Sequence, residues 1–276
     1  MNLMKYISQY YRGLIGRIVE FRVNLTNRRV IFRDKYNFLY FLLPGDNIAT
    51  YYVNQATTDS TNVVNYILKH LEKGSTCIDI GSRIGGISIP MWHKSELNGK
   101  VISVEADPQN IKLIEENLKL NRYPSNYVYN AAVTDHKGVV QLRCYEGING
   151  WQTLGNPDFA STYKSNLIEV AAITFSDLMD EFKLNSVDFV KIDVEGAEPM
   201  VLSGMALFLQ EKRIKCVIFE VNHLMLEGLD KTVDDLMCIW DNYDYDLYRL
   251  LSDGTLSKLS NKWPEKLIGD CIALAR

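Results

Sequence analysis

The sequence predicts an α/β fold of the Rossmann-like, doubly wound kind, with a mostly parallel sheet of seven strands and helices on both faces. Two observations lead to this expectation. From residue 76 onward, apolar runs of strand length alternate with segments of helical periodicity. Several of these runs are continuously apolar, which is typical of strands whose two faces are both covered. We expect this domain to span residues 56–276, after a small N-terminal extension over residues 1–55.

The alternation of strands and helices can be followed along the chain. The expected strands cover residues 76–80, 100–105, 127–133, 187–194, 216–221, 245–251 and 271–275. The expected helices cover residues 84–97, 108–121, 175–182, 198–213 and 233–243. Residues 139–144 and 167–173 break the alternation and predict an additional strand pair, and the segment 147–166 between them is expected to be a loop.

The first 35 residues differ from the rest, because they hold eight basic residues against two acidic ones. Apolar residues recur at helical spacing within residues 3–21, which predicts an amphipathic helix. In one interpretation, this helix packs against the domain or against a second subunit. The second of these cases would make the protein a homo-oligomer. The other interpretation rests residues 1–23 on a membrane surface or an acidic partner.

Two short strands, over residues 30–32 and 38–43, and a helix follow this segment. Asp59-Ser60 is expected to cap that helix, which runs to Leu71 and is ended by Gly74.

Composition narrows the class of protein. A hydrophobic content of 47%, a charged content of 23% and a net charge of -4 are typical of a globular protein and give no indication of a nucleic-acid partner. Of the five cysteines, Cys77, Cys216 and Cys271 lie in apolar runs and no two form a CxxC pair, which predicts buried free thiols. We expect a reducing, cytoplasmic location, with peripheral membrane contact as the alternative.

The strongest motif is the loop Asp79–Gly85, with the sequence Asp-Ile-Gly-Ser-Arg-Ile-Gly, between a strand and a helix. Glycines permit a tight turn and close approach of a ligand to the backbone. A nicotinamide-dinucleotide loop would read GxGxxG, and its second glycine is missing here. The loop therefore favours a cofactor without pyrophosphate, such as S-adenosylmethionine (SAM). We expect Gly81, Ser82 and Gly85 to bind it and Asp79 to meet its amino group, directly or through water.

The second motif is an apolar strand that ends in Glu105, 24 residues after Gly81. An acid at the end of the second strand of such a fold accepts hydrogen bonds from ribose hydroxyls. We therefore expect Glu105 to bind the ribose of the cofactor. Ala106, which follows it, and Ala131, in the next expected strand, are further cofactor-binding candidates.

The third motif is an apolar strand that runs into charged residues, among them Lys191, Asp193, Glu195 and Glu198. Because ligands bind at the carboxyl ends of the strands in doubly wound sheets, we expect Asp193 and Glu195 at the crevice. Lys191 is expected either to pair with a carboxylate or to reach the crevice. Glu198 is interpreted as a first-turn residue that complements the helix dipole.

The fourth motif is a strand that ends in Glu220, Asn222 and His223. A histidine can accept a proton near neutral pH, although His223 could also be a structural loop residue. Asp193 and His223 are our first candidates for a general base; Glu195, Glu220 and Lys191 are the further catalytic candidates. A divalent metal such as magnesium, held by Asp193 and nearby acids, stays open.

At these four motifs the sequence resembles the FkbM family of SAM-dependent methyltransferases, over roughly residues 55–275. The most specific part is Val187–Gly204, which contains Asp-Phe-Val-Lys-Ile-Asp-Val-Glu-Gly-Ala-Glu. The cofactor loop departs from the family in having Ser82-Arg83 where Ala-Asn is usual. The resemblance implies a class I methyltransferase fold, SAM as cofactor, and O-methylation of a hydroxyl on a sugar, a glycan or a glycosylated natural product.

Two other functions stay open at this point. A nicotinamide-dependent oxidoreductase or epimerase is disfavoured by the missing glycine, and a non-catalytic SAM-fold scaffold in glycan assembly is the second alternative. Trp151, Phe159 and Tyr163, in the expected loop 147–166, are candidates to cover a sugar acceptor. Packing of that loop on the domain is the other interpretation.

Overall fold

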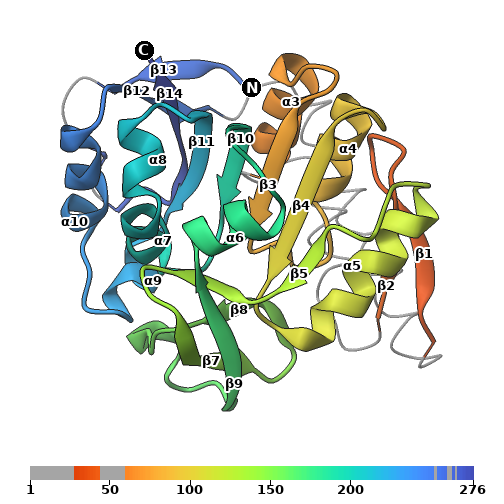
Figure 1. The fold of residues 1–276 in the computed structure, drawn as a ribbon. Helices are drawn as coiled ribbons and strands as arrows, with labels where there is room; N and C mark the ends of the chain where they lie inside the picture. Colours follow the sequence, from red (N-terminus) through yellow and green to blue (C-terminus); the bar gives the residue numbers. More distant parts are fainter. Residues whose placement is uncertain (1–27, 44–59, 252–253, 260–262, 265) are drawn as a thin grey trace, which may run out of the picture.

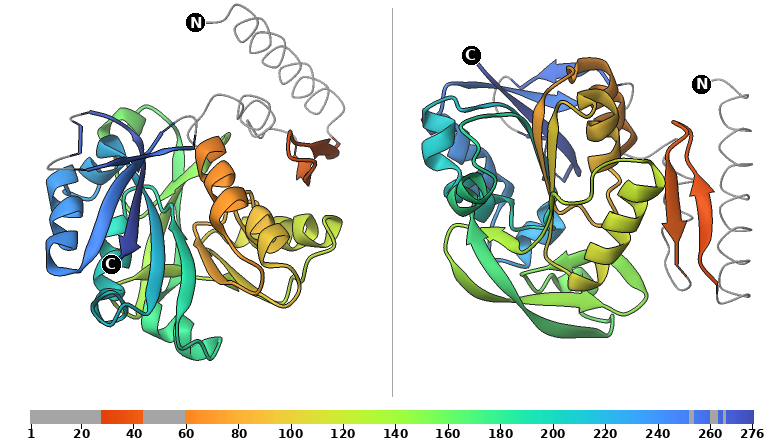
Figure 2. Two further views of the ribbon diagram at one scale, coloured as in Figure 1. Left: turned by 90° about the horizontal axis from the view of Figure 1, so that it is seen from above. Right: turned by 45° about the vertical axis from the view of Figure 1, so that its right-hand side comes forward.

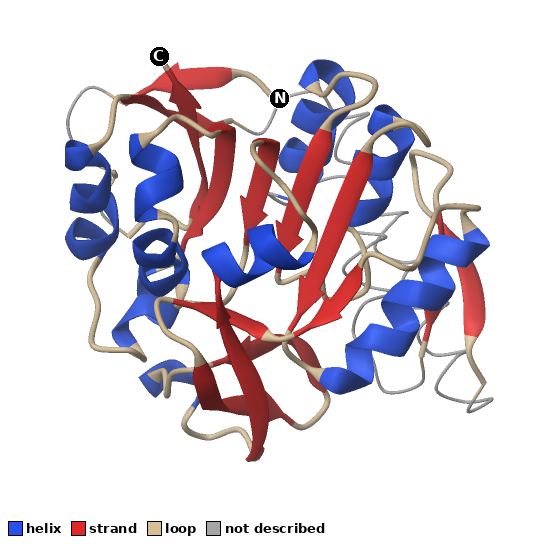
Figure 3. Ribbon diagram, in the orientation of Figure 1, coloured by secondary structure: helices blue, strands red, loops and turns tan. Residues whose placement is uncertain are grey.

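A central sheet of eight strands organises the computed structural model, in the order β13-β12-β14-β11-β10-β3-β4-β5 (Figures 1 and 3). The strands are β3 (Thr76–Ile80), β4 (Lys100–Glu105), β5 (Val128–Asn130), β10 (Val187–Ile192), β11 (Ile214–Val221), β12 (Tyr245–Leu250), β13 (Leu256–Lys258) and β14 (Gly269–Ala275). Neighbours from β5 to β11 pair in parallel, and β14 lies antiparallel between β11 and β12. The expected mostly parallel Rossmann-like sheet is confirmed. Its eighth strand, β13, has only three residues and gave no pattern in the sequence.

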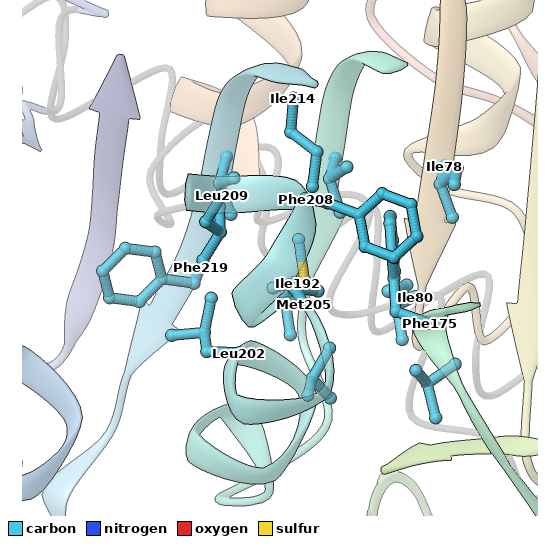
Figure 4. Close-up of a cluster of buried hydrophobic side chains, with 14 of the residues drawn as sticks. Ile78, Ile80, Phe175, Ile192, Leu202, Met205, Phe208, Leu209, Ile214 and Phe219 are labelled. Atoms are coloured by element: carbon cyan, nitrogen blue, oxygen red, sulfur yellow. The ribbon is translucent and has the colours of Figure 1, made fainter. Parts of the chain in front are cut away.

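Helices cover both faces of this sheet. One group is α3 (Ser60–His70), α4 (Ser88–Ser95) and α5 (Pro108–Leu120). The other is α6 (Phe175–Glu181), α7 (Glu198–Gly204), α8 (Ala206–Gln210) and α10 (Val233–Cys238), with the short α9 (His223–Glu227), η1 (Asp158–Ala160) and η2 (Ile239–Asn242). Side chains alternate along each strand: Ile78 packs with the second group, as Figure 4 shows, while Cys77 packs with the first. This double burial explains the continuous apolar runs.

Two expected elements are each broken in two. The expected strand 127–133 divides at Ala131 into β5 and β6 (Ala132–Thr134), because β6 leaves the central sheet and pairs with β9 (Ser165–Thr174). The expected helix 198–213 divides after Gly204 into α7 and α8. A side chain at Gly204 would lie 2.6 Å from the carbonyl oxygen of Thr134, so the helix approaches β6 closely at this point.

A second sheet has the order β6-β9-β7-β8. The predicted strand pair is confirmed, since β7 (Gly138–Tyr145) and β9 pair antiparallel along their whole length. The expected loop 147–166 was partly wrong: it contains β8 (Ile148–Thr153), which pairs with β7. In Figure 1 the arrowheads of β3, β4 and β10 point toward this second sheet.

A hairpin of β1 (Val30–Arg33) and β2 (Leu39–Leu42) packs beside α5, as the right-hand view of Figure 2 shows. Asn117 of α5 and Asn121, one turn later at its C-cap, bind β2. Their side-chain oxygens accept hydrogen bonds from the N–H groups of Phe41 and Leu39, at 2.8 and 2.9 Å. These bonds satisfy the edge of β2, and Tyr40 and Leu42 are buried in the same core cluster as residues of α3, α4 and α5.

The structure describes residues 28–43, 60–251, 254–259, 263–264 and 266–276. The expected helix over residues 3–21, the contact of residues 1–23 with a membrane, the boundary at residue 55 and the cap residue Asp59 lie outside these ranges. Within them, no helix has the length and apolar character needed to cross a membrane. All five cysteines are free, and Cys77, Cys216 and Cys271 are buried as predicted.

Candidate active site

A cavity of about 480 Å³ runs along the carboxyl edge of the central sheet, between this edge and β8. The strand order gives it two different ends. Toward β4 and β5 it is lined by apolar residues such as Ala131, Val133 and Leu142, and toward β10 and β14 by charged ones. The charged residues that line it are Arg83, Glu105, Lys191, Asp193, Glu195, Glu220 and Asp270. Carboxyl groups therefore outnumber basic groups in the lining, which suits a cationic ligand.

The loop after β3 forms one wall through Gly81 and Ser82. Gly81 has a φ of +83°, and a Cβ there would lie 1.8 Å from the carbonyl oxygen of Asp193. Only glycine fits at this position. We had expected a ligand to approach Gly81, but the backbone at the end of β10 does so instead. Gly85 has a φ of +85°, and a Cβ there would make only ordinary contacts, with Ile114 and Ile89 at 3.7 Å; it does not line the cavity. Its role is to shape the turn into α4.

Glu105 is placed at the end of β4 by backbone donors. Its Oε2 accepts from the N–H of Arg83 at 2.7 Å, and its Oε1 accepts from the N–H of Asp107 at 2.8 Å. Burial raises the pKa of Glu105 to about 7, against these hydrogen bonds, which lower it. The carboxylate has about four lone-pair sites, which these two bonds and a hydrogen bond with the side chain of Asn110 do not fill, so Glu105 can still accept a hydroxyl in the cavity.

Asp79 does not line the cavity, although we expected it to meet the cofactor. Its side chain is 1% exposed and accepts a hydrogen bond of 2.5 Å from the hydroxyl of Ser88, which in turn accepts one from Ser103. Burial raises the pKa of Asp79 to about 6. The structure shows Asp79 anchoring the start of α4 to β3, and its contact with a cofactor stays a prediction.

Lys191 is the centre of a buried ionic cluster. Its ammonium lies 3.1 Å from Oδ1 of Asp270 and 3.5 Å from Oδ2 of Asp193, and it donates to the carbonyl of Ile192 at 3.2 Å. Burial alone would lower the pKa of Lys191, but the charges of Asp193 and Asp270 raise it above its usual range. Lys191 therefore stays protonated at neutral pH, and both expectations for it hold, because it pairs with carboxylates and lines the cavity.

The loop after β10 presents Asp193 and Glu195 to the cavity. It is held by Glu198, which accepts from the N–H groups of Val194 and Gly196 at 3.0 and 3.1 Å. Glu198 is 1% exposed, so it fixes the loop rather than only complementing the helix dipole. This clamp permits the left-handed conformation of Glu195, whose φ is +53°.

Glu220 and Glu195 face the same part of the cavity. Burial raises the pKa of both carboxyl groups well above their usual range, and the negative charges of Asp193 and Glu198 raise it further. Both stay predicted catalytic residues beside Asp193.

His223, one of the two first candidates for a general base, does not line the cavity. It is the first residue of α9, and its Nδ1 is buried without a hydrogen-bond partner in the described structure. The preceding residue, Asn222, lines the cavity in its place and donates to Glu220 at 3.4 Å.

Asp270 was missed by sequence reasoning. It is the second residue of the antiparallel strand β14, and pairing of Glu220 with Asp270 brings the start of β14 to the edge where β11 ends. The rule that ligands bind at the carboxyl ends of strands does not cover a residue at the start of an antiparallel strand. The signal that could have found it is the acid directly before the apolar run that starts at Cys271.

The strand β8 covers the cavity from the other side and is tied down at three points. Gln152 donates to Asp107 at 3.2 Å, and Thr153 donates to the carbonyl of Glu195 at 2.7 Å. The guanidinium of Arg83 lies against Gly150, where a Cβ would approach it to 2.5 Å. The unusual arginine of the loop therefore meets β8 directly.

Trp151, also on β8, lines the cavity and is surrounded by other aromatic rings. Its ring meets those of Tyr145, Phe159 and Tyr163 edge to face, at centroid distances of 6.4, 5.2 and 5.7 Å. Phe159 and Tyr163 thus pack around Trp151, and Trp151 reaches the cavity, while contact of this segment with an acceptor stays a prediction.

No group of three or more His, Cys, Asp or Glu side chains has a metal-binding arrangement in the part of the chain that the structure describes. The described residues therefore offer no set of ligands for magnesium at Asp193.

The fold and cavity together define a Rossmann-like domain with a ligand site at the carboxyl edge of its sheet. A model of the methyltransferase FkbM domain matches residues 79–247. The chain belongs to this family of methyltransferases, and the resemblance seen in the four motifs is confirmed.

The chain is also similar to solved structures. A precorrin-6y C5,15-methyltransferase from Geobacter metallireducens is 12% identical, with a TM-score of 0.43 over 80% of this chain and 90% of that one. An O-methyltransferase from Bacillus cereus in complex with SAH is 12% identical, with a TM-score of 0.42 over 80% and 83%. The chain spans 55% of a similar protein from Streptococcus mutans, at 12% identity, a TM-score of 0.45 and 89% of this chain. No curated protein sequence matches significantly.

Proposed function

We propose that this chain transfers a methyl group from SAM to a hydroxyl of a sugar or glycan. The observation that carries the proposal is Glu105, a carboxylate held by two backbone N–H groups at the end of β4, in the cavity of a chain of the FkbM family. An acid in this place accepts hydrogen bonds from ribose hydroxyls.

The residues of the cavity fit SAM. Ala106, Ala131, Val133 and Leu142 make an apolar end beside Glu105, which suits an adenine ring. The excess of carboxylates suits the positive charges of the sulfonium and amino groups. Gly81 and Ser82 would contribute the loop wall.

When bound, SAM supplies an electrophilic methyl group on a sulfonium. The chain must place the attacking hydroxyl in line with it, and much of the rate acceleration can come from this alignment. A hydroxyl is a weak nucleophile until its proton leaves. Asp193 is our candidate to accept that proton, because its side chain is 40% exposed in the cavity and lies beside the Lys191 ammonium.

Trp151 supports a sugar as the acceptor. A tryptophan offers an apolar ring face together with an N–H donor, and a sugar presents C–H faces and hydroxyls. The three surrounding rings hold Trp151 in one orientation, so that little side-chain entropy is lost when an acceptor binds.

The direct test is incubation with methyl-labelled SAM and a panel of sugar nucleotides and glycans. We expect label in an ether methyl group of one acceptor class, and the Asp193→Asn variant should lose at least about 100-fold in kcat. The Trp151→Ala variant should raise KM for the acceptor and leave KM for SAM within about twofold. SAM binding without turnover on any hydroxylated acceptor would support the scaffold alternative instead.

A further inference from the structure

The ionic cluster around Lys191 contains two charged residues, Lys191 and Asp270, that are buried, as charged side chains in proteins rarely are unless they are paired. Lys191 is 2% exposed and Asp270 is 6% exposed. Lys191 has three N–H donors, and the structure accounts for all three directions: the Ile192 carbonyl, Asp270 and Asp193. The contact with Asp193, at 3.5 Å, is the longest.

We propose that Asp270 is a positioning residue for methyl transfer, because it anchors the Lys191 ammonium so that Lys191 holds the Asp193 carboxylate in the cavity. This role rests on the proposed function of Asp193. Asp270 comes from β14, which runs antiparallel to β10 and β11. It therefore reaches the site from the start of its strand, whereas Asp193 and Glu220 reach it from the ends of theirs.

A purely structural role explains the cluster less well. Asp270 and Glu220 are direct cross-strand partners, and two acids in such a pair repel each other. Replacing a buried ion pair by apolar groups of similar size is commonly neutral or stabilising. Stability alone therefore gives no reason for a lysine and an aspartate at these two positions, whereas orientation of Asp193 does.

Because Asp270 is present, the Lys191 ammonium lies between two carboxylates, those of Asp270 and Asp193. If Asp270 is removed, the ammonium loses its nearest anion and can move toward Asp193 by changing its rotamer. Asp193 would then be drawn out of its place beside the acceptor. A shift of about 1 Å at a reacting group can cost on the order of 100-fold in rate.

The test is steady-state kinetics on the full chain with SAM and the acceptor found in the labelling experiment. We expect Asp270→Asn to lower kcat by about 10- to 100-fold while KM for SAM stays within about twofold. In the Asp193→Asn background the same change should cost little more, because both variants disable one unit. An additive loss, or an unchanged kcat, would overturn the proposal.

The matched control is Asp188→Asn, at the other end of β10. Asp188 accepts from the N–H of Thr76 at 2.8 Å and pairs with Lys215 at 2.7 Å, outside the cavity lining. This variant should lower the free energy of unfolding. It should not lower kcat selectively while KM for SAM stays constant. Equal kinetic losses in the Asp188 and Asp270 variants would show that the effect is only structural.

A second variant guards against misfolding. Lys191→Met combined with Asp270→Leu replaces the pair by apolar groups, so its melting temperature should stay near that of the wild type while kcat falls. Wild-type kcat in this double variant would refute the positioning role. A wild-type chain that binds SAM but methylates no hydroxyl would instead overturn the proposed function, and the role of Asp270 with it.

Discussion

Substitution of Gly81 by alanine tests how β3 and β10 are joined at the site. The new Cβ would lie 1.8 Å from the carbonyl oxygen of Asp193, where ordinary contact begins at 3.4 Å, so that the end of β10 must move by about 1.6 Å. Overpacking of this kind costs about 1–3 kcal/mol, and the left-handed φ of +83° adds about 1–2 kcal/mol. We expect a total loss of about 2–5 kcal/mol in the free energy of unfolding.

Thermal unfolding measures this loss. For a chain of this length 1 kcal/mol corresponds to about 2–4 °C, so Gly81→Ala should lower Tm by about 4–20 °C. Gly85→Ala is the matched control, because its φ of +85° is nearly the same but its Cβ would meet only Ile114 and Ile89, at 3.7 Å. It should lose about 1–2 kcal/mol from strain alone. Equal Tm losses in the two variants would refute the steric argument.

Two further predictions follow from the buried carboxylates. Ribose hydroxyls donate to the ionised form of Glu105, whose pKa burial raises to about 7, so SAM should bind more weakly at pH 6 than at pH 8. Calorimetry should find this dependence reduced in Glu105→Gln, and an unchanged dependence would exclude Glu105 as its source. Ser88→Ala removes the donor that favours the charged form of Asp79 and should cost about 1–3 kcal/mol in urea unfolding. This cost should be larger at pH 8 than at pH 5, since the pKa of Asp79, already raised to about 6, rises further. Ser95→Ala, on the same helix, removes a hydroxyl that meets the thiol of Cys77 at 3.7 Å and should cost less at both pH values.

The sequence predicted the central sheet well because its strands are buried on both faces and its helices have one apolar face. The periodicity reports these two patterns directly. It could not report that β6 leaves the sheet at Ala131, since an apolar strand looks the same in either sheet. Nor could it show β8, whose glycine and asparagine are typical of a loop and whose pairing with β7 is a tertiary contact.

The site was predicted in the same uneven way. Glu105, Asp193, Glu195 and Glu220 line the cavity because each lies at the carboxyl end of a parallel strand or in the loop that follows it, which is a rule of the fold. Asp270 escaped that rule because β14 is antiparallel. His223 follows a strand as the rule requires, but the chain turns into α9 there, so position along the chain could not settle where its ring lies.

The central claim is that the cavity at the carboxyl edge binds SAM through Glu105. Calorimetric titration of the wild type with SAM and with NAD tests it most directly. We expect SAM to bind and NAD not to bind, and we expect Glu105→Ala to weaken SAM binding by at least about tenfold, corresponding to roughly 1.4 kcal/mol. The control Glu146→Ala, which removes an exposed partner of Lys164, should bind SAM as the wild type does. Tight binding of NAD without binding of SAM would contradict the account.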